Sequence, residues 1–469
     1  MINNLAYIVA CVLFIMGIKK LNKPDTARKG NLLSALGMLI AVLAAFFETE
    51  VLQSWNTNNF MQNGFLWAGL AILIGSVIGI IWSKKVKMTG MPELVAIYNG
   101  FGGLASFLVA FTQFLREPGA IPGFVAVSIS LTIFTGAITF TGSMLAWGKL
   151  SEKITGRAIV FKGQKAINLL LLLASIAAMV IYAAGIDTDA NMIVIIILAA
   201  ISLVFGVTLV LPIGGGDMPV VISLLNSLSG LAVAMAGFII SNTVLIVAGA
   251  LVGASGMILT LIMCKAMNRS ITNLLFSGFG SADNTSSKGP GAEPKSASVE
   301  DTYLVLEAAQ SVVFIPGYGM AVAQAQHVVK ELAEKLENNG AEVSFAIHPV
   351  AGRMPGHMNV LLAEADIPYE NLKTMDEINP VMPMTDVAIV IGANDVVNPA
   401  AETDNSSPIY GMPIIKAYEA KTVFVLKRGK GRGFSGIEND LFTMQNTLMV
   451  YGDAKATISS LAGEFSGDN

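Results

Sequence analysis

A short apolar run, a glycine turn and a helical pattern follow one another at residues 311–326, which read SVVFIPGYGMAVAQAQ. The run Ser311–Ile315 is typical of a buried strand. Gly317 allows a tight turn after this strand, and Gly319 lets another group approach the backbone where the helix begins. Val322 replaces the third glycine of the usual dinucleotide-binding turn, so an ordinary tight turn explains the stretch equally well.

Strand-like and helix-like runs alternate after this turn. Residues 321–338 are helical in pattern, and a second strand is predicted at residues 342–347. Three further apolar, β-rich runs are predicted as strands: Val387–Ile391, Thr422–Leu426 and Thr447–Tyr451. This alternation predicts a Rossmann-like α/β domain with an open, mostly parallel sheet over residues 301–469.

The loops that follow these strands favour one kind of dinucleotide. An NAD site usually has an acid after the second strand, but this chain has a stretch from His348 to Arg353 without one. A basic cluster follows the run Thr422–Leu426 and consists of Lys427, Arg428, Lys430 and Arg432. These cations suit a ribose 2′-phosphate, so NADP is favoured over NAD, with a solvated basic loop as the alternative.

One acidic residue is expected at the same edge of the sheet. Gly392-Ala393-Asn394-Asp395 follows the strand predicted at residues 387–391. Ligands of parallel sheets bind at the carboxyl ends of the strands. Asp395 is therefore suited to hydrogen-bond a nicotinamide or ribose, or to cap a helix. His327 and His357 have no partners at metal-ligand spacing, and no metal site is predicted.

The remainder of the chain has a different composition. The 469 residues are 54% hydrophobic and only 13% charged, whereas soluble proteins are about 25% charged. This composition excludes the possibility that the whole chain is a soluble enzyme, a disordered protein or a nucleic-acid-binding protein. Residues 1–270 have 16 basic and 9 acidic side chains, and residues 271–469 have 13 and 24. We predict a transmembrane domain at 1–276, a Gly/Ser/Pro-rich flexible linker at 277–300 and a soluble domain at 301–469.

The apolar runs predict about nine helices that cross a membrane. A span needs roughly 17–25 apolar residues. The candidates are residues 4–18, 32–52, 64–82, 93–115, 122–147, 167–186, 191–211, 218–240 and 243–264. Loops rich in Lys and Arg alternate with loops that lack them, and basic loops stay cytoplasmic. This pattern predicts an outside N-terminus and a cytoplasmic C-terminal domain.

Polar residues within the spans are candidates for a proton path. Burying a polar side chain in lipid costs free energy, so its presence there needs a reason. The predicted spans contain Asn99, Ser223 and Asn226. One helical face has Ser128, Thr132, Thr135, Thr139 and Ser143. Hydrogen bonding between helices is the favoured interpretation of that stripe, whereas both interpretations stay open for the two asparagines. Gly249 and Gly253 predict close helix packing.

No Asp, Glu, His, Lys or Arg lies deep within any of the nine spans. A coupled pump needs a group whose charge can be switched, so a partner subunit would have to supply it. Asp217 is the one charge of the seventh loop, and it is suited to face Lys265 and Arg269 on the same side of the membrane.

Stretches along the whole chain resemble the β subunit of proton-translocating NAD(P) transhydrogenase. They are MPELVA (91–96), GGDMPVV (215–221), MCKAMNRS (263–270), PGYGMAVAQAQ (316–326) and residues 348–364, 392–401 and 452–456. The resemblance implies hydride transfer from NADH on a partner subunit to NADP⁺ on this chain, coupled to inward proton movement. The competing hypothesis is a transporter or channel whose cytoplasmic domain senses NADP(H).

The resemblance also implies roles for individual residues. Asp395 corresponds to the family's acid near the nicotinamide, and is the expected catalytic residue. The expected cofactor-binding residues are Gly317, Tyr318, Gly319, Met320, Ala321, Val322, Arg353, Gly392, Ala393, Asn394, Asp395, Lys427, Arg428, Gly452, Asp453, Ala454 and Lys455. Those expected on the proton path or in coupling are Asn99, Asp217, Ser223, Asn226, Lys265 and Arg269. The unusually basic loop 427–432 leaves open which cation binds the 2′-phosphate.

One departure from the family pattern concerns the proton path. Some members have a protonatable histidine in the fourth span, where this sequence has Asn99. We therefore expect the switching histidine on an α-type partner, which would also bind NAD(H) and supply the remaining membrane helices. The expected assembly is a dimer of the αβ unit in the lipid of the inner (plasma) membrane, without nucleic acid.

Overall fold

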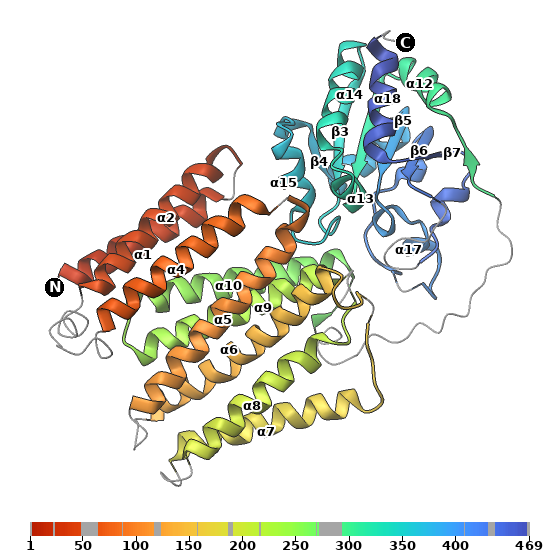
Figure 1. The fold of residues 1–469 in the computed structure, drawn as a ribbon. Helices are drawn as coiled ribbons and strands as arrows, with labels where there is room; N and C mark the ends of the chain where they lie inside the picture. Colours follow the sequence, from red (N-terminus) through yellow and green to blue (C-terminus); the bar gives the residue numbers. More distant parts are fainter. Residues whose placement is uncertain are drawn as a thin grey trace. The chain divides into compact units, whose positions relative to one another are not determined.

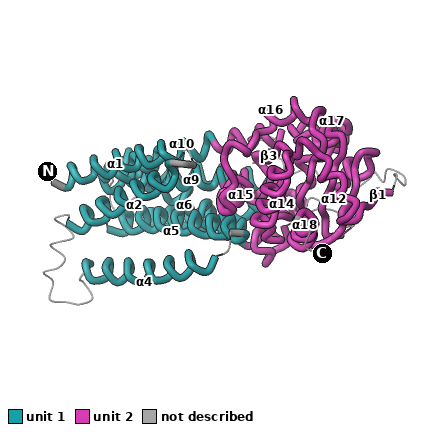
Figure 2. Tube along the Cα trace, turned by 90° about the horizontal axis from the view of Figure 1, so that it is seen from above, with its two compact units in different colours: residues 1–147, 166–210, 223–258 teal, residues 148–165, 211–222, 259–469 magenta. Residues whose placement is uncertain are grey.

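The computed structural model forms two compact units (Figure 2). The first contains Met1–Trp147, Ala166–Val210 and Ser223–Ile258, and the second contains Gly148–Lys165, Leu211–Ile222 and Leu259–Asn469. The structure describes residues 2–21, 24–47, 64–86, 88–116, 123–156, 158–185, 191–214, 217–268, 270–271, 293–407, 409–429 and 437–466. Most of the predicted linker, 277–292, and the residues Arg269, Lys430 and Arg432 lie outside these ranges.

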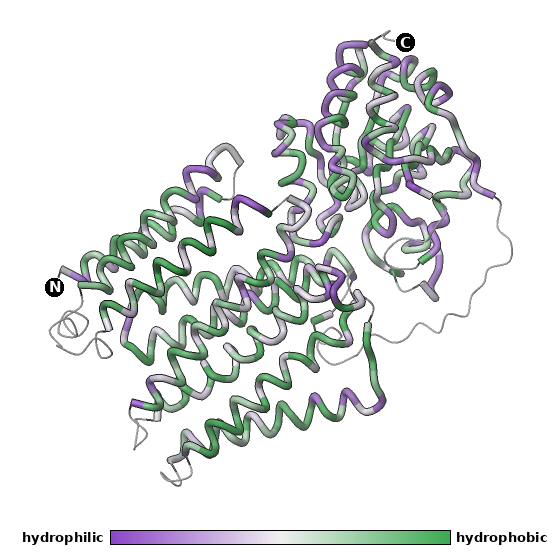
Figure 3. The backbone as a smooth tube through the Cα atoms, viewed as in Figure 1, coloured by the Kyte–Doolittle hydropathy of each residue, from purple (hydrophilic) through white to green (hydrophobic). Residues whose placement is uncertain are grey.

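Nine helices in the described residues are long and apolar enough to cross a membrane (Figures 1 and 3). They are α1 (Ile2–Leu21), α2 (Pro24–Phe46), α4 (Gly64–Lys85), α5 (Met91–Arg116), α6 (Gly123–Leu150), α7 (Gln164–Ala184), α8 (Asn191–Val210), α9 (Met218–Ile239) and α10 (Thr243–Ala266). Helices suit lipid because all their backbone hydrogen bonds are internal. The predicted helical membrane bundle is confirmed, although α2 begins eight residues before the predicted start at residue 32. Hydropathy finds the apolar centre of a helix better than its polar ends.

The nine helices differ in how much of each is covered by protein. The most apolar window is 72% buried in α9 and 61% in α6, but 0% in α4. Polar side chains on α6 and α9 are therefore the ones best shielded from lipid.

Glycines bring α9 and α10 into backbone contact, as the GxxxG spacing predicted. A Cβ atom added at Gly249 would lie 2.7 Å from the Gly230 carbonyl oxygen, close to the Ala234 backbone as well. A Cβ atom at Gly253 would have its nearest neighbour, the Leu231 amide nitrogen, at 3.4 Å. A methyl group at Gly249 would therefore overlap the backbone of α9, whereas Gly253 has room for one.

The C-terminal α/β domain, here also called the soluble domain, has a parallel seven-stranded sheet in the part of the chain that the structure describes. Its strands are β1 (Lys295–Ser296), β2 (Ser311–Pro316), β3 (Glu342–Ile347), β4 (Leu372–Thr374), β5 (Val387–Ile391), β6 (Thr422–Lys427) and β7 (Thr447–Tyr451). The strand order is β1-β7-β6-β5-β2-β3-β4, and every pair is parallel. Without β1 this is the doubly wound order, whose topological switch point lies between β2 and β5. The predicted α/β class is confirmed, and the short edge strands β1 and β4 are additions.

The first described strand of this domain lies before the predicted boundary at residue 301. Strand β1 begins at Lys295, within the stretch predicted as linker, and pairs with β7. Ser298 then caps helix α12 (Val299–Glu307) through a capping box with Asp301. The Ser298–Asp301 spacing is the usual signal for such a cap.

The helix predicted at residues 321–338 is wrong in one respect. The structure has two helices there, α13 (Tyr318–Val322) and α14 (Gln326–Asn338). Gln324 adopts a positive φ of 51° between them, which ends the first helix. Apolar periodicity does not detect a break of this kind.

Side chains of alternate residues along the strands fill two cores, one on each face of the sheet. On one face Val312 and Phe314 pack with helices α12, α14 and α18 (Ala454–Ser466). On the other face Val313 and Ile315 pack with the loops and short helices that follow β4, β5 and β6. Burial on both faces explains why the strands are apolar throughout.

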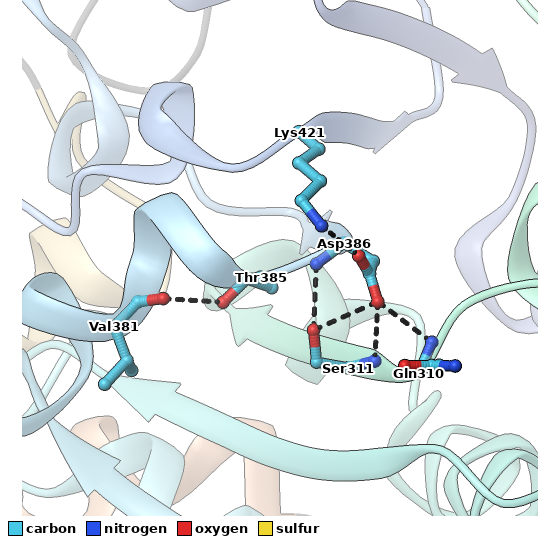
Figure 4. A network of polar contacts seen from close by, with 6 residues as sticks. All are labelled: Gln310, Ser311, Val381, Thr385, Asp386 and Lys421. Carbon is cyan, nitrogen blue, oxygen red and sulfur yellow. Dashed lines mark hydrogen bonds and ion pairs between the residues drawn. The ribbon is translucent and has the colours of Figure 1, made fainter.

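A polar clamp fixes the amino ends of three strands (Figure 4). The carboxylate of Asp386 accepts hydrogen bonds from the backbone amides of Gln310 and Ser311 and from Lys421 Nζ, at 2.7–3.0 Å. The Lys421 ammonium, followed by the Gln310 amide, lowers the pKa of Asp386 to about 2. The clamp ties β2, β5 and β6 together at the edge opposite their carboxyl ends.

The close contact between α9 and α10 yields a test. We expect Gly249→Ala to destabilise the membrane unit by about 1–3 kcal/mol, because the added methyl group overlaps the backbone of α9. Thermal unfolding of the detergent-solubilised protein measures the change. Gly253→Ala is the matched control and should change the unfolding temperature little; equal effects of the two substitutions would contradict this packing.

Candidate functional site

The turns after β2 and β5 meet at the switch point of the sheet. The Gly317 amide donates to the Ile391 carbonyl at 2.9 Å, and the Gly319 amide donates to the Gly392 carbonyl at 3.0 Å. A Cβ atom at Gly392, where φ is +63°, would lie 2.7 Å from the Met320 amide nitrogen. Glycine is therefore needed at these positions because the backbones of the two turns touch each other and leave no room for a side chain.

Arg353 lies beside this glycine turn. Its guanidinium carbon is 4.2 Å from the centre of the Tyr318 ring, in a cation–π contact. The Arg353 backbone amide donates to Nδ1 of the buried His357, at 3.1 Å. The segment between β3 and helix α15 (His357–Glu364) therefore places a cation next to the residue between Gly317 and Gly319.

The two histidines of this segment are buried and neutral. His348 Nδ1 accepts from the Val350 amide, so its Nε2–H donates to the Pro413 carbonyl at 2.8 Å. Burial lowers the pKa of His348 to about 4. Burial, and next the charge of Arg353, lower the pKa of His357 to about 4. Neither ring carries a positive charge near neutral pH.

Asp395 lies at the same edge, directly after β5. It is half-buried and begins the short 3₁₀ helix Asp395–Val397. Asn394 Nδ2 donates to Asp395 Oδ1 at 3.0 Å, and Asn439 Nδ2 donates to the Asn394 carbonyl at 2.9 Å. These bonds orient the loop that contains Asp395.

The basic residues predicted to bind phosphate follow β6. Lys427 ends this strand, is half-buried and lies over the Phe442 ring, with Nζ 4.6 Å from the ring centre. Burial lowers the pKa of Lys427. The next residue, Arg428, is exposed. A half-buried cation and an exposed one are thus adjacent at this position.

The last predicted nucleotide motif follows the neighbouring strand β7. The Gly452 amide donates to the Lys427 carbonyl at 3.1 Å, which joins the two loops. Asp453 Oδ1 accepts from the amides of Lys455 and Ala456, so this carboxylate caps helix α18. The predicted residues of the soluble domain therefore come together at the carboxyl edge of β2, β3, β5, β6 and β7.

A second polar cluster joins three membrane helices. Asn99 of α5 donates through Nδ2 to Ser143 Oγ of α6, at 2.9 Å. The Ser229 hydroxyl of α9 lies 2.9 Å from Asn99 Oδ1 and 2.8 Å from the Asn226 carbonyl. This hydroxyl has one proton, so it can donate to only one of the two oxygens at a time.

The Ser/Thr stripe of α6 divides into two groups. Ser128, Thr132 and Thr135 each donate to a carbonyl four residues earlier in α6, so they do not join helices. The Thr139 hydroxyl is buried without a hydrogen-bond partner among the described residues, and so is the Ser223 hydroxyl of α9. Within the stripe, Ser143 is the residue with a hydrogen bond to another helix.

The remaining predicted coupling residues lie at helix ends. Asp217 directly precedes α9, and its amide donates to the Gly214 carbonyl at 3.1 Å. Lys265 is exposed in the last turn of α10. Arg269 lies outside the described residues, so the expected grouping of the three charges stays a prediction.

Known proteins of one family match this chain over nearly its whole length. The family model "NAD(P) transhydrogenase beta subunit" matches residues 3–464. A protein called "NAD(P) transhydrogenase subunit beta" from Rhodospirillum rubrum is 47% identical over an alignment of 460 residues, and the alignment covers 96% of each chain. Its counterpart from R. rubrum strain ATCC 11170 gives the same values. The chain belongs to the NAD(P) transhydrogenase beta subunit family.

Family membership confirms the resemblance stated from the sequence. The chain is a subunit of an enzyme, NAD(P) transhydrogenase, and has several membrane spans. The name of the beta subunit implies an alpha partner, and the family implies NAD(P) substrates. The individual site residues stay predictions.

Two residues of this beta subunit were missed from the sequence. Ser229 completes the cluster around Asn99, and its spacing of three from Asn226 was the available signal. Lys149 was counted as a loop charge, but it lies in the last turn of α6 and is 1% exposed. Its Nζ donates to the carbonyls of Leu211 and Ile213 at 2.6 and 2.7 Å. Sequence alone does not show which carbonyls a basic residue will meet.

The buried histidines predict a dependence of stability on pH. An unfolded histidine has a pKa near 6.5, and folded His348 has a pKa of about 4. The unfolded chain therefore binds more protons between these values, and His348 alone should cost about 2–3 kcal/mol of stability between pH 7 and pH 4.5.

Hydrogen exchange of the β3 and β5 amides measures this loss. His348→Gln keeps a donor for the Pro413 carbonyl and should flatten the pH dependence, whereas His327→Gln, at an exposed position, should not. An identical pH dependence in both variants would refute the assignment.

Proposed function

We propose that this subunit takes part in hydride transfer from NADH on the alpha partner to NADP⁺ on its own soluble domain, with inward movement of protons. The observation that carries the proposal is the meeting of the glycine turn, Lys427 and Arg428 at one carboxyl edge of the sheet. A dinucleotide at a switch point places its phosphates against such a turn. The same chain has a buried polar cluster across three membrane helices.

The residues at the sheet edge fit NADP(H). Gly317 and Gly319 form the turn beside which the pyrophosphate would lie, while Lys427 and Arg428 would hold the 2′-phosphate. The loop after β3 has no acid to accept a ribose 2′-hydroxyl, and Arg353 supports the preference for a further phosphate. When bound, NADP(H) supplies the centre that accepts or gives the hydride.

The chain's residues would hold this centre rather than act as acid or base. Asp395 is oriented by Asn394, and Asn439 holds the loop in place. We propose that Asp395 contacts the nicotinamide end, because it follows β5 beside the switch point. Hydride transfer between two cofactors needs their close and correct orientation, which a rigid sheet edge can supply.

The membrane helices supply hydrogen-bonding groups for protons. Asn99, Ser143 and Ser229 form a connected set, and the unpartnered hydroxyls of Thr139 and Ser223 are suited to bond water. Hydroxyls and amides relay protons but do not store charge. We therefore propose that a histidine of the alpha partner is the switching group.

A membrane voltage gives this coupling its free energy. One charge that crosses 100 mV contributes about 2.3 kcal/mol, and about 1.4 kcal/mol changes an equilibrium tenfold. One proton per hydride can therefore shift the NADPH ratio more than tenfold. We propose that the assembly is a dimer of αβ units in the inner membrane, with the soluble domain in the cytoplasm.

Reconstitution with the alpha partner tests the proposal. In vesicles, NADH should reduce NADP⁺ faster and further when a proton gradient is imposed that drives protons toward the side of the soluble domain. This gradient adds driving force to the hydride transfer. Absorbance of the reduced cofactors and a pH-sensitive dye follow both processes. An identical rate and final ratio with and without the gradient would rule out coupling, and transport without hydride transfer would indicate a sensor domain on a transporter.

Arg428 allows a test of cofactor choice. Arg428→Ala should weaken NADP⁺ binding about 10- to 100-fold and NAD⁺ binding less than about twofold, since a charged hydrogen bond is worth roughly 1.5–3 kcal/mol. Calorimetric titration of the purified complex measures both. Lys330→Ala removes a surface cation of α14 and is the control. Equal losses for the two nucleotides would remove Arg428 from the phosphate site.

A further inference from the structure

Arg353 bonds the segment that follows α6. Within the second compact unit, Nη1 donates to the Leu150 carbonyl at 2.8 Å and Nη2 donates to Glu152 Oε1 at 2.9 Å. Leu150 is the last residue of α6, whose terminal carbonyls have no partner within the helix. A cation at this end of a helix is also favoured by the helix dipole.

The same guanidinium lies against the glycine turn. Its contact with the Tyr318 ring places it next to Gly317 and Gly319, while the Arg353 amide is anchored to the buried His357. The anchor fixes the backbone of Arg353 and leaves the long side chain to choose its partners. One cation thus serves two neighbours, a turn of the membrane segment and the turn proposed to hold a dinucleotide.

The bond to Glu152 is the easier of these contacts to exchange. The Glu152 side chain is 69% exposed, and exposed ion pairs contribute only about 0–1 kcal/mol. Glu152 also has a positive φ of 58°, which is unfavourable for a residue with a side chain. A phosphate, which accepts two parallel bonds from a guanidinium, is a stronger partner.

We propose that Arg353 is a positioning residue that exchanges between the 150–152 turn and an anionic group bound at the Gly317–Gly319 turn. This inference rests on the proposed function, because the anionic group is the phosphate of NADP(H). Binding of NADP(H) draws the guanidinium from Leu150 and Glu152 and frees the end of α6. By linkage, a change that loosens Glu152 strengthens NADP(H) binding.

Binding of NADP⁺ to the purified αβ complex tests the exchange. Glu152→Gln keeps the size of the side chain and removes its charge, so the dissociation constant for NADP⁺ should fall about two- to fivefold. Glu370→Gln, another exposed carboxylate of the same unit, is the matched control and should leave it unchanged. Glu152→Asn, which tolerates a positive φ, should also tighten binding and guards against a folding defect in the first variant.

Hydrogen exchange provides a second measurement on the wild-type complex. The amides of Glu152 and Ile154 donate to the carbonyls of Lys149 and Gly148, so they report on this turn. NADP⁺ should raise their exchange, and a merely structural Arg353–Glu152 pair would not respond. Unchanged or weaker binding in both Glu152 variants would overturn the exchange while the proposed function stands. A wild-type complex that binds no NADP⁺ would instead overturn the proposed function, and the exchange with it.

Discussion

Lipid offers no hydrogen bonds, and this constraint determines most of the first unit. Every backbone group within the bilayer must be satisfied inside the protein, so the chain crosses as helices. Side chains follow the same rule: Ser128, Thr132 and Thr135 bond their own helix, and Asn99 bonds neighbouring helices. The buried hydroxyls of Thr139 and Ser223 have no hydrogen-bond partner in the described parts of the chain, so they mark positions where water or a partner group is needed.

In the soluble domain, the turns at the switch point are joined by direct contact between backbones rather than by contact between side chains. Gly317, Gly319 and Gly392 let two turns touch at the switch point, while the Asp386 clamp fixes the opposite edge of the same strands. The strands β2 and β5 are therefore tied to each other at both of their ends. A rigid edge suits a reaction in which two cofactors must meet in one orientation.

The proposed exchange of Arg353 connects these two kinds of structure through one side chain. A strong contact would lock the α6 end to the nucleotide turn, whereas a weak, exposed pair can be displaced by a phosphate. The equilibrium between the two partners then depends on nucleotide occupancy, as linkage requires.

Composition and periodicity were sufficient for the fold class. Nine apolar segments and five of the seven strands were predictable, because each depends on burial of consecutive or alternate apolar residues. Long-range partners were not predictable in this way. Periodicity did not predict the helix break at Gln324 or the burial of Lys149, and it did not identify Asn99 as the partner of Ser229.

The sequence by itself determined that this protein has a helical membrane domain and a parallel α/β domain, and its motifs were specific enough to indicate the family. Only the tertiary structure decided that Gly317 and Gly319 contact Gly392, that three membrane helices share one polar cluster, and that Arg353 bonds Leu150 and Glu152. The physical reason is that apolar burial acts on every residue locally and leaves a periodic pattern. A hydrogen bond between residues as many as 200 positions apart leaves no such pattern, and depends on where folding brings the two groups.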